Sequence, residues 1–398
     1  MTLHFPGMHP SVTTAPVVPE PAARVVVGES PSPFALAPPA GMLSRIKVAI
    51  ADWRRDRKNA ALAQRLRKQP RGPYPDHGYS VFTGPMKTNG LCRAYHYEIE
   101  RLKAEGLYNP ASRNLLILGQ PRQYRKLMRA VPEGFAEAYR IGLWVTEFDV
   151  MPPDWAFAVD LVHEVWTPSS FSASALKATG LPVKVQPHAV RVTPGAALPR
   201  SRFDVSNDAF LGLAIMDLGT CPDRKNPLAH IAAWRMAFGE DPNAVLLMKV
   251  KLSRHKGFVR KALIDAIGAS KNIRLIEEQF SDAEITGFQR MADVYLSLHR
   301  AEGYGLNIHE MLELGIPTIA TGWSGNVEFM RTYKHAHAVD YRLVPYHDKT
   351  LHYQGKTLHW SEPDVAQSAA LLRVIRTTQE SMKLYHATDI ADQLRIAV

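Results

Sequence analysis

The chain has only two cysteines in its 398 residues, Cys92 and Cys221, and they lie far apart in the sequence. Two such residues cannot form a disulfide framework, so a reducing compartment is the simplest expectation. Long apolar runs are missing too, because no stretch reaches the roughly 18 apolar residues that a spanning helix needs. The first residues, MTLHFPGMHPSV, have no charged start followed by an apolar run. We therefore expect no secretory signal and a cytoplasmic protein.

Sequence motifs typical of catalytic metal sites are also scarce. No Asp-x-Asp motif occurs in a plausible loop, and no set of Cys and His has the spacing of metal ligands. His335 and His337 could ligate a metal in principle, but two such histidines in a loop without carboxylates are more often exposed side chains. We expect no metal and no organic cofactor, so that arginine and lysine would do what Mg²⁺ does elsewhere.

The net charge of +10 is concentrated in one segment. Residues 44–68 contain nine Lys/Arg and two Asp, a net +7, and the rest of the chain is close to balanced. A nucleic-acid interface would spread basic residues over a face and interleave them with aromatics, whereas only Trp53 and Tyr74 lie near this cluster. We therefore expect no nucleic acid as a partner and keep that class only as an alternative.

The N-terminal part of the chain divides into two segments before any regular pattern begins. Residues 1–43 are rich in Pro, Ala, Val and Ser and are predicted to be a disordered tail. Residues 44–78 form a basic amphipathic segment, in which Ile46, Ile50 and Trp53 follow helical spacing opposite a face of Arg and Lys. This segment could lie on an anionic membrane surface or pack as a solvated helix against the first domain.

From residue 79 onward, short apolar runs alternate with helical stretches, which predicts parallel sheets covered by helices. A Pro-rich linker at 191–204 separates two such patterns. We predict an α/β protein with two Rossmann-like, doubly wound domains that face each other across a cleft. The first spans residues 79–198, the second spans 205–380, and a C-terminal helix at 381–398 could return to the first domain.

The expected elements are specific enough to be checked. The predicted strands are 79–84, 114–119, 141–147, 164–169 and 183–190 in the first domain, and 210–217, 244–252, 273–278, 294–300 and 316–321 in the second. The predicted helices are 93–105, 122–130, 227–238, 257–267, 282–291, 305–314, 364–387 and 389–398.

The most informative stretch runs from residue 296 to residue 330, where a strand, a glycine-bearing loop and a helix follow one another. Such a junction directs free backbone N–H groups and the positive helix end into the crevice, where a diphosphate is the natural occupant. Gly303 and Gly305, on either side of Tyr304, would let the backbone approach a ligand closely. The helix is predicted to begin near Leu306.

Two carboxylates belong to the same stretch. Glu302 begins the loop and Glu310 lies in the first turns of the helix. A carboxylate can accept two hydroxyl hydrogen bonds at once, and both a sugar ring and a ribose offer such hydroxyl pairs. Either glutamate alone could be a surface residue, but the complete string favours a functional site.

The stretch resembles the Glu–seven residues–Glu motif of glycosyltransferase family 4, a family of retaining GT-B enzymes. The similarity extends through GIPTIAT, and Ser324–Asn326 resembles family members that build bacterial exopolysaccharides and lipopolysaccharides. The resemblance implies that Glu302 contacts hydroxyls of the donor sugar and that Glu310 holds the ribose. It also implies that the backbone N–H groups of Gly303 to Leu306 face the sugar and the phosphates.

The family also supplies cations after the first strand of the second domain, and CPDRKNP gives Arg224 and Lys225 at that place. Fixed positive groups there would meet the charge that develops on the leaving nucleoside diphosphate. A further family lysine ends the next strand and corresponds to Lys249. The family's separate, earlier arginine has no clear counterpart. Each of the three residues could instead be a solvated surface charge.

Three strings of the first domain resemble the same family. GPMKTNGL, which includes Gly90, is similar to the loop that approaches the diphosphate, or is an ordinary turn. IGLWVTEFDVMPPDW and HEVWTPSSF resemble two further family strings. Glu147 and Asp149 follow a predicted strand end, where Glu147 could bind the acceptor, polarise its hydroxyl or cap a turn. His188 is interpreted as a hinge or core residue rather than a base.

These observations predict a hexosyltransferase. The donor would be a nucleotide sugar of the GDP-mannose or UDP-glucose type, and the acceptor a lipid-linked glycan or oligosaccharide in surface polysaccharide synthesis. The basic segment would place the protein on the inner face of the cytoplasmic membrane. A GT-B epimerase and a homologue that has lost donor binding are alternatives, whereas a phosphorylase would need a pyridoxal-phosphate lysine motif that is absent from the sequence.

Overall fold

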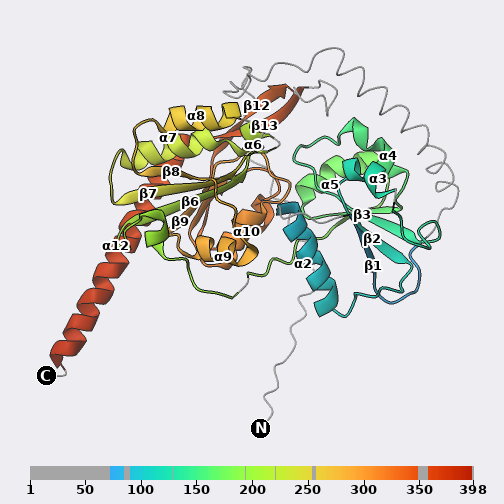
Figure 1. The fold of residues 1–398 in the computed structure, drawn as a ribbon, viewed down its shortest axis with the longest axis horizontal. Coiled ribbons are helices and arrows are strands. Elements are labelled where there is room, and N and C mark those ends of the chain that lie inside the picture. The colour runs from blue at the N-terminus through green and yellow to red at the C-terminus, as the bar shows by residue number, and fades with distance from the viewer. Residues whose placement is uncertain are drawn as a thin grey trace, which may run out of the picture.

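The computed structural model describes residues 72–84, 90–128, 130–192, 194–219, 221–252, 257–347 and 357–396. The predicted tail at 1–43 and nearly all of the basic segment at 44–78 lie outside these residues. No helix in the described part of the chain is long and apolar enough to cross a membrane. Figure 1 shows two α/β domains side by side, each built around its own sheet.

The first domain has a five-stranded parallel sheet whose strands follow one another in chain order. The strands are β1 (Ser80–Thr83), β2 (Asn114–Leu118), β3 (Tyr139–Leu143), β4 (Glu164–Thr167) and β5 (Val183–Val185), and the helices are α2 (Gly90–Ala104), α3 (Pro121–Leu127), α4 (Ala156–Val159) and α5 (Ser170–Leu176), with 3₁₀ turns at Pro153–Trp155 and Lys177–Thr179. All five predicted strands are present, although the fifth ends at Val185 rather than at residue 190. Among the described strands, the order does not reverse in this sheet, so the doubly wound arrangement predicted for both domains is not seen here.

The second domain has a six-stranded parallel sheet with the order β11-β10-β9-β6-β7-β8. Its strands are β6 (Phe210–Asp217), β7 (Ala244–Lys251), β8 (Ile273–Ile276), β9 (Val294–Ser297), β10 (Thr318–Thr321) and β11 (Ala336–Val339), and its helices are α6 (Pro222–Lys225), α7 (Pro227–Phe238), α8 (Gly257–Ile267), α9 (Asp282–Arg290), α10 (Leu306–Glu313) and α11 (Val327–Met330), with a 3₁₀ turn at Arg200–Phe203 before β6. The order reverses between β6 and β9, so this sheet is doubly wound as predicted.

The second sheet is buried on both faces, which explains why its strands read as continuous apolar runs. Helices α7 and α8 cover one face, where Trp234 packs directly over Gly212. A Cβ atom at Gly212 would lie 2.3 Å from the indole ring, so only glycine fits beneath it. Helices α9, α10 and α11 cover the other face around Phe288 and Met311. The point between β6 and β9 where the strand order reverses thus lies between two packed layers of helices.

A C-terminal hairpin was not predicted. Strands β12 (Tyr341–His347) and β13 (Thr357–Pro363) pair antiparallel, separately from both parallel sheets. The prediction of a loop for the KHAH histidines is wrong for His337, because β11 pairs it with Ile319 of β10. His335 lies just before that strand and its Nε2 contacts the carbonyl of Leu312 at 2.9 Å.

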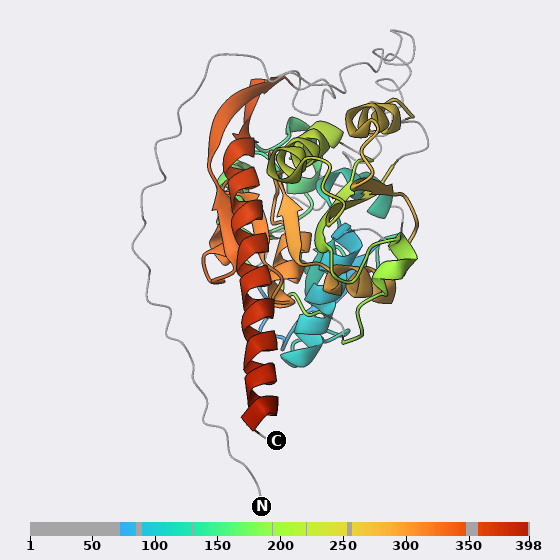
Figure 2. The same cartoon turned by 90° about the vertical axis from the view of Figure 1, so that its left-hand side faces the viewer.

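The chain continues into a single helix, α12 (Val365–Ile396), where the sequence predicted two. Leu372 and Ile375 pack into the core beneath α7, so the first half of α12 belongs to the second domain. Figure 2 shows the helix running along one side of that domain. Its last turns point away from the first domain in Figure 1, rather than toward it as we considered from the sequence.

Candidate functional site

A cleft of about 710 Å³ lies between the two domains. Its walls come from the residues after β3 in the first domain and from the carboxyl ends of β6, β7 and β9 in the second. In open α/β sheets, ligands bind outside the carboxyl ends of the strands where the strand order reverses. The cleft lies at this position in the second domain, and its size is that of a typical small-molecule site.

The loop between β9 and α10 forms one wall of the cleft. Gly305 precedes α10 in a left-handed conformation with φ of 92°. A Cβ atom at Gly303 would lie 2.2 Å from the Val145 side chain and 2.7 Å from the Thr146 carbonyl oxygen. Glycine is therefore needed at Gly303 because the first domain presses against it, a reason that the sequence alone did not reveal.

The Ser-Gly-Asn string holds this loop in place. The Glu302 backbone N–H donates to Ser324 Oγ at 2.9 Å, and the Gly325 N–H donates to the Glu302 carbonyl at 2.9 Å. Asn326 Oδ1 lies 3.0 Å from Nε2 of His299, which follows β9. The string that resembled polysaccharide-building enzymes thus fixes the backbone on both sides of the Glu302 carboxylate.

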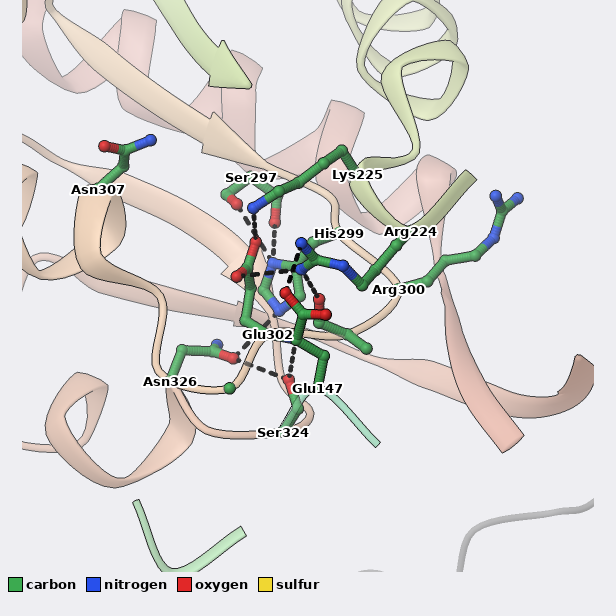
Figure 3. Close-up of polar contacts among 12 residues, drawn as sticks. Glu147, Arg224, Lys225, Ser297, His299, Arg300, Glu302, Asn307, Ser324 and Asn326 are labelled. Atoms are coloured by element: carbon green, nitrogen blue, oxygen red, sulfur yellow. Dashed lines mark hydrogen bonds and ion pairs between the residues drawn. The ribbon is translucent and has the colours of Figure 1, made fainter. Parts of the chain in front are cut away.

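Four charged side chains, one of them Glu302, form a cluster at the start of the β9–α10 loop (Figure 3). Lys225 Nζ donates to Glu302 Oε1, and Arg224 Nη1 lies 3.2 Å from Glu302 Oε2. Arg224 Nη2 lies 2.8 Å from Oε1 of Glu147, which comes from the first domain. Arg224 Nη1 also donates to the Ala301 carbonyl at 2.7 Å. The structure therefore brings together all four residues for which the sequence predicted a catalytic part.

Charge neutralisation governs the protonation of this cluster. Burial favours the neutral form of Glu302, but the charges of Lys225 and Arg224 outweigh it and lower the pKa to about 2. Burial alone would lower the pKa of Arg224, whereas Glu147 and Glu302 raise it above its usual value. At neutral pH Glu302 and Arg224 are consequently both charged.

The two predicted cations have different surroundings. Arg224 is almost fully enclosed, with 6% of its side chain exposed, and spans two carboxylates. Lys225 keeps 18% exposed and lines the cleft beside Glu302. Arg224 is thus placed to hold Glu147 and Glu302 in position, while Lys225 presents the ammonium group that a ligand can reach.

Lys249 lines the cleft at the end of β7. Its ammonium group stands over the Phe280 ring at 5.0 Å, and no carboxylate of the described ranges forms an ion pair with it. Burial first, and then the nearby charges of Lys251 and Arg93, lowers the pKa of Lys249. A cation in a cleft without its own counter-ion is suited to an anionic ligand such as a phosphate.

Glu310 does not face the cleft as the sequence led us to expect. Only 2% of it is exposed, and it does not line the cleft that the described residues form. Its Oε2 accepts from Gln289 at 2.8 Å and lies 3.2 Å from Arg93 Nη1, while Oε1 accepts from the Tyr97 hydroxyl at 3.1 Å. Arg93 and Tyr97 belong to α2 of the first domain, so a ribose cannot reach Glu310 in this arrangement.

The remaining predicted site residues are placed as follows. Tyr304 and Leu306 line the cleft. Gly90 begins α2, but most of its loop, residues 85–89, lies outside the described residues. Glu147 lines the cleft with 47% of its side chain exposed, and its neighbour Phe148 stacks on Tyr346 of the hairpin at 5.6 Å. The hairpin thus supports the wall that carries Glu147.

The position of His188 is consistent with the prediction of a hinge or core residue. It is 5% exposed, and its ring meets the Tyr304 ring edge-on at 4.8 Å. Burial, and to a smaller extent the charge of His309, lowers the pKa of its imidazole to about 3. His188 is therefore neutral at physiological pH. Within the described ranges, no group of three or more His, Cys, Asp or Glu side chains could hold a metal ion.

Sequence reasoning missed the contacts that join the domains. The Ser169 hydroxyl donates to the Gly303 carbonyl at 2.6 Å, and that of Ser172 lies 3.3 Å from the same oxygen. The Ser170 backbone N–H donates to Glu328 of the second domain at 2.7 Å. The signal was present in the string TPSSF, whose serines dock the first domain onto the β9–α10 loop.

Comparisons with known proteins agree with this architecture. Neither protein-family models nor curated protein sequences give a match to the chain. Among solved structures, the HepE protein of Anabaena in complex with UDP-glucose is similar, with 14% identity, a TM-score of 0.53, and coverage of 77% of this chain and 91% of HepE. WaaG, a glycosyltransferase involved in lipopolysaccharide biosynthesis, has 11% identity and a TM-score of 0.47 over 76% of this chain and 90% of its own.

At such identities, the likeness establishes the fold. The similarity to HepE spans most of both chains and therefore includes both domains. Two parallel α/β domains face each other across a cleft, and the strand order of the second reverses beside it. The chain has the GT-B fold predicted from its sequence.

Proposed function

We propose that the protein is a retaining glycosyltransferase that moves a hexosyl unit from a nucleotide sugar to a glycan acceptor. The observation that carries the proposal is the Glu302 cluster, in which an ionised carboxylate and an accessible lysine lie together at the reversal point of the second sheet. A carboxylate suits sugar hydroxyls, and an ammonium group suits a departing phosphate. The motif's resemblance to glycosyltransferase family 4 supports the same reading and the retaining outcome.

The donor is proposed to lie along the β9–α10 loop. Its sugar hydroxyls would bind Glu302, and its diphosphate would lie near Lys225, Lys249 and the N-terminal backbone amides of α10. These positive groups are fixed before the reaction begins, so they stabilise the charge of the leaving group without reorganisation. We propose that no metal ion is required, because lysine and the helix end supply this charge.

The acceptor is proposed to enter from the first domain. Glu147 is a carboxylate of that domain that lines the cleft, and Arg224 links it to Glu302. A carboxylate in this position can accept a hydrogen bond from the attacking hydroxyl and orient it. We further propose a lipid-linked acceptor used in surface polysaccharide synthesis, which residues 44–68 would help to approach on an anionic membrane.

The first experiment is a thermal-shift panel with UDP, GDP and ADP, with UDP-glucose and GDP-mannose, each with and without Mg²⁺. A ligand that binds only the native state raises the melting temperature by mass action. We expect one base to give a shift that does not depend on Mg²⁺, after which release of its diphosphate from the nucleotide sugar measures turnover. A homologue that has lost donor binding would show no shift with any of the five compounds.

A further inference from the structure

Two side chains of helix α2 in the first domain bind the carboxylate of Glu310, the second glutamate of the motif that resembles a donor site. Arg93 donates to Asn307 Oδ1 at 2.6 Å and pairs with Glu310 at 3.2 Å, and Tyr97 donates to Glu310 at 3.1 Å. Arg93 and Asn307 both line the cleft, whereas Glu310 lies behind them. The contacts therefore form a cover across the part of α10 that follows the Glu302 loop.

The carboxylate of Glu310 is buried and engaged at both oxygens while this cover is in place. Its Oε1 accepts the Tyr97 hydroxyl, and its Oε2 accepts Gln289 and Arg93. Gln289 belongs to α9 of the second domain and would remain with Glu310 in any domain movement. Among the contacts of Glu310 in the described residues, only those from α2 cross between the domains, so they are the ones that a ligand would have to replace.

We infer that Arg93 and Tyr97 compete with the donor's ribose for Glu310, so that nucleotide binding must withdraw α2 from α10. The inference rests on the proposed function, since it takes a nucleoside diphosphate as the ligand. A ribose diol can donate two hydrogen bonds to a carboxylate, and thus replaces the donors that the arginine and the tyrosine supply. The apparent affinity for a nucleotide is lowered by the fraction of molecules in which α2 covers Glu310.

Withdrawal of α2 requires movement of the first domain as a body. Tyr95 and Leu102 of α2 are buried in the core of that domain, so the helix cannot leave α10 alone. The same movement would part Ser169 from Gly303 and Ser170 from Glu328. Donor binding and domain opening are therefore coupled through one set of contacts.

The test is calorimetric titration of Arg93→Ala, Arg93→Lys and Tyr97→Phe with UDP and GDP. We expect Arg93→Ala to lower the dissociation constant of the bound nucleotide about tenfold, because a charge-assisted hydrogen bond no longer opposes the ligand. Arg93→Lys and Tyr97→Phe disturb folding less and should lower it about threefold. Arg113→Ala removes an ion pair with Asp76 within the first domain and is the matched control, which should change nothing.

A double-mutant cycle identifies the shared carboxylate. In a Glu310→Gln background, Arg93→Ala should give less than half of its gain in affinity, because the charge for which both ligands compete is gone. A full gain in that background would overturn the inference. A higher dissociation constant in Arg93→Ala would also overturn it, by making Arg93 a residue that binds the nucleotide rather than one that excludes it.

Hydrogen exchange separates the inference from the proposed function. UDP or GDP should slow exchange in residues 306–313 and speed it in residues 90–104, since the first segment gains a ligand and the second loses its contacts. Arg93→Ala should speed exchange in residues 90–104 without any ligand. If no nucleotide binds to any variant but this last effect occurs, the proposed function fails while the cover is confirmed; if exchange in 90–104 stays unchanged, the inference fails.

Discussion

Glu302 shows how a single side chain can be both largely enclosed and ionised. Burial opposes its charge, but Lys225 and Arg224 contribute more in the opposite direction. The same pairing keeps Lys225 next to the position where a leaving phosphate would gain charge. Individual roles within such a cluster can be separated by variants that remove one charge at a time.

Lys225→Ala should lower kcat about a hundredfold and raise the donor KM less than threefold. The lysine meets more negative charge in the transition state than in the bound donor, so its removal raises the barrier more than it weakens binding. Initial rates at varied UDP-glucose or GDP-mannose measure both constants. If the loss were found entirely in KM, Lys225 would be a ground-state binding residue.

Glu302→Gln should destabilise the protein in a pH-dependent manner. The folded pKa of Glu302, about 2, lies below its ordinary value of 4.5, so the carboxylate stabilises the folded state above about pH 4.5. This contribution, on the order of 3 kcal/mol, is lost as the pH falls from 4.5 toward 2. Urea unfolding of both proteins at pH 7, 5 and 3.5 should give free-energy differences that are equal at the first two values and smaller at the third.

At the scale of elements, periodicity was sufficient for ten of the eleven parallel strands in the described residues and for most helices, whereas the edge strand β11 was missed. Apolar runs such as FLGLAIMD predict buried strands because parallel sheets are covered on both faces. The hairpin was missed because β12 contains Pro345 and polar residues, and its partner is recognised only when the two strands pair. Turns and strands that depend on partners far away in the sequence have little local periodicity from which they could be predicted.

The serine cap of α5 provides a prediction at this scale. Ser169 accepts from the Ser172 N–H at 3.2 Å and donates to Gly303 at 2.6 Å, so it serves its own helix and the other domain. Ser169→Ala should cost about 2 kcal/mol of unfolding free energy, measured by urea denaturation. Ser174→Ala, on the exposed face of the same helix, is the control and should cost less than about 0.5 kcal/mol.

The sequence identified the charged residues of the candidate site in both domains, but not the contacts that join the domains around it. Resemblance to glycosyltransferase family 4 predicted Glu302, Arg224 and Lys225 as site residues, and the structure brings them together because they follow the neighbouring strands β9 and β6 of one sheet. Arg93 lies more than 200 positions before Glu310, and neither residue carries a pattern that points to the other. Contacts between domains depend on the angle at which two finished units meet, and residue spacing does not encode that angle.

At the scale of the whole molecule, the basic segment provides the remaining prediction. Deleting residues 1–68 should abolish sedimentation with phosphatidylglycerol vesicles, because it removes the cluster that carries most of the net charge. Nucleotide-sugar hydrolysis should change less than twofold, since Glu302, Lys225 and Lys249 all lie beyond the deletion. Equal sedimentation of the shortened and full-length chains would refute a membrane role for this segment.

The two ion pairs of Arg224 bear on how fast a bound nucleotide sugar would be lost to water in the proposed reaction. One guanidinium joins Glu147 of the first domain to Glu302 of the second, so the three charges form a complete set only while the domains are together. A nucleotide sugar held by an opened protein would face an incomplete set, and its transfer to water would be correspondingly slow. In the proposed reaction, the shared arginine would link the reactivity of the donor to the closure of the two domains and would limit hydrolysis between turnovers.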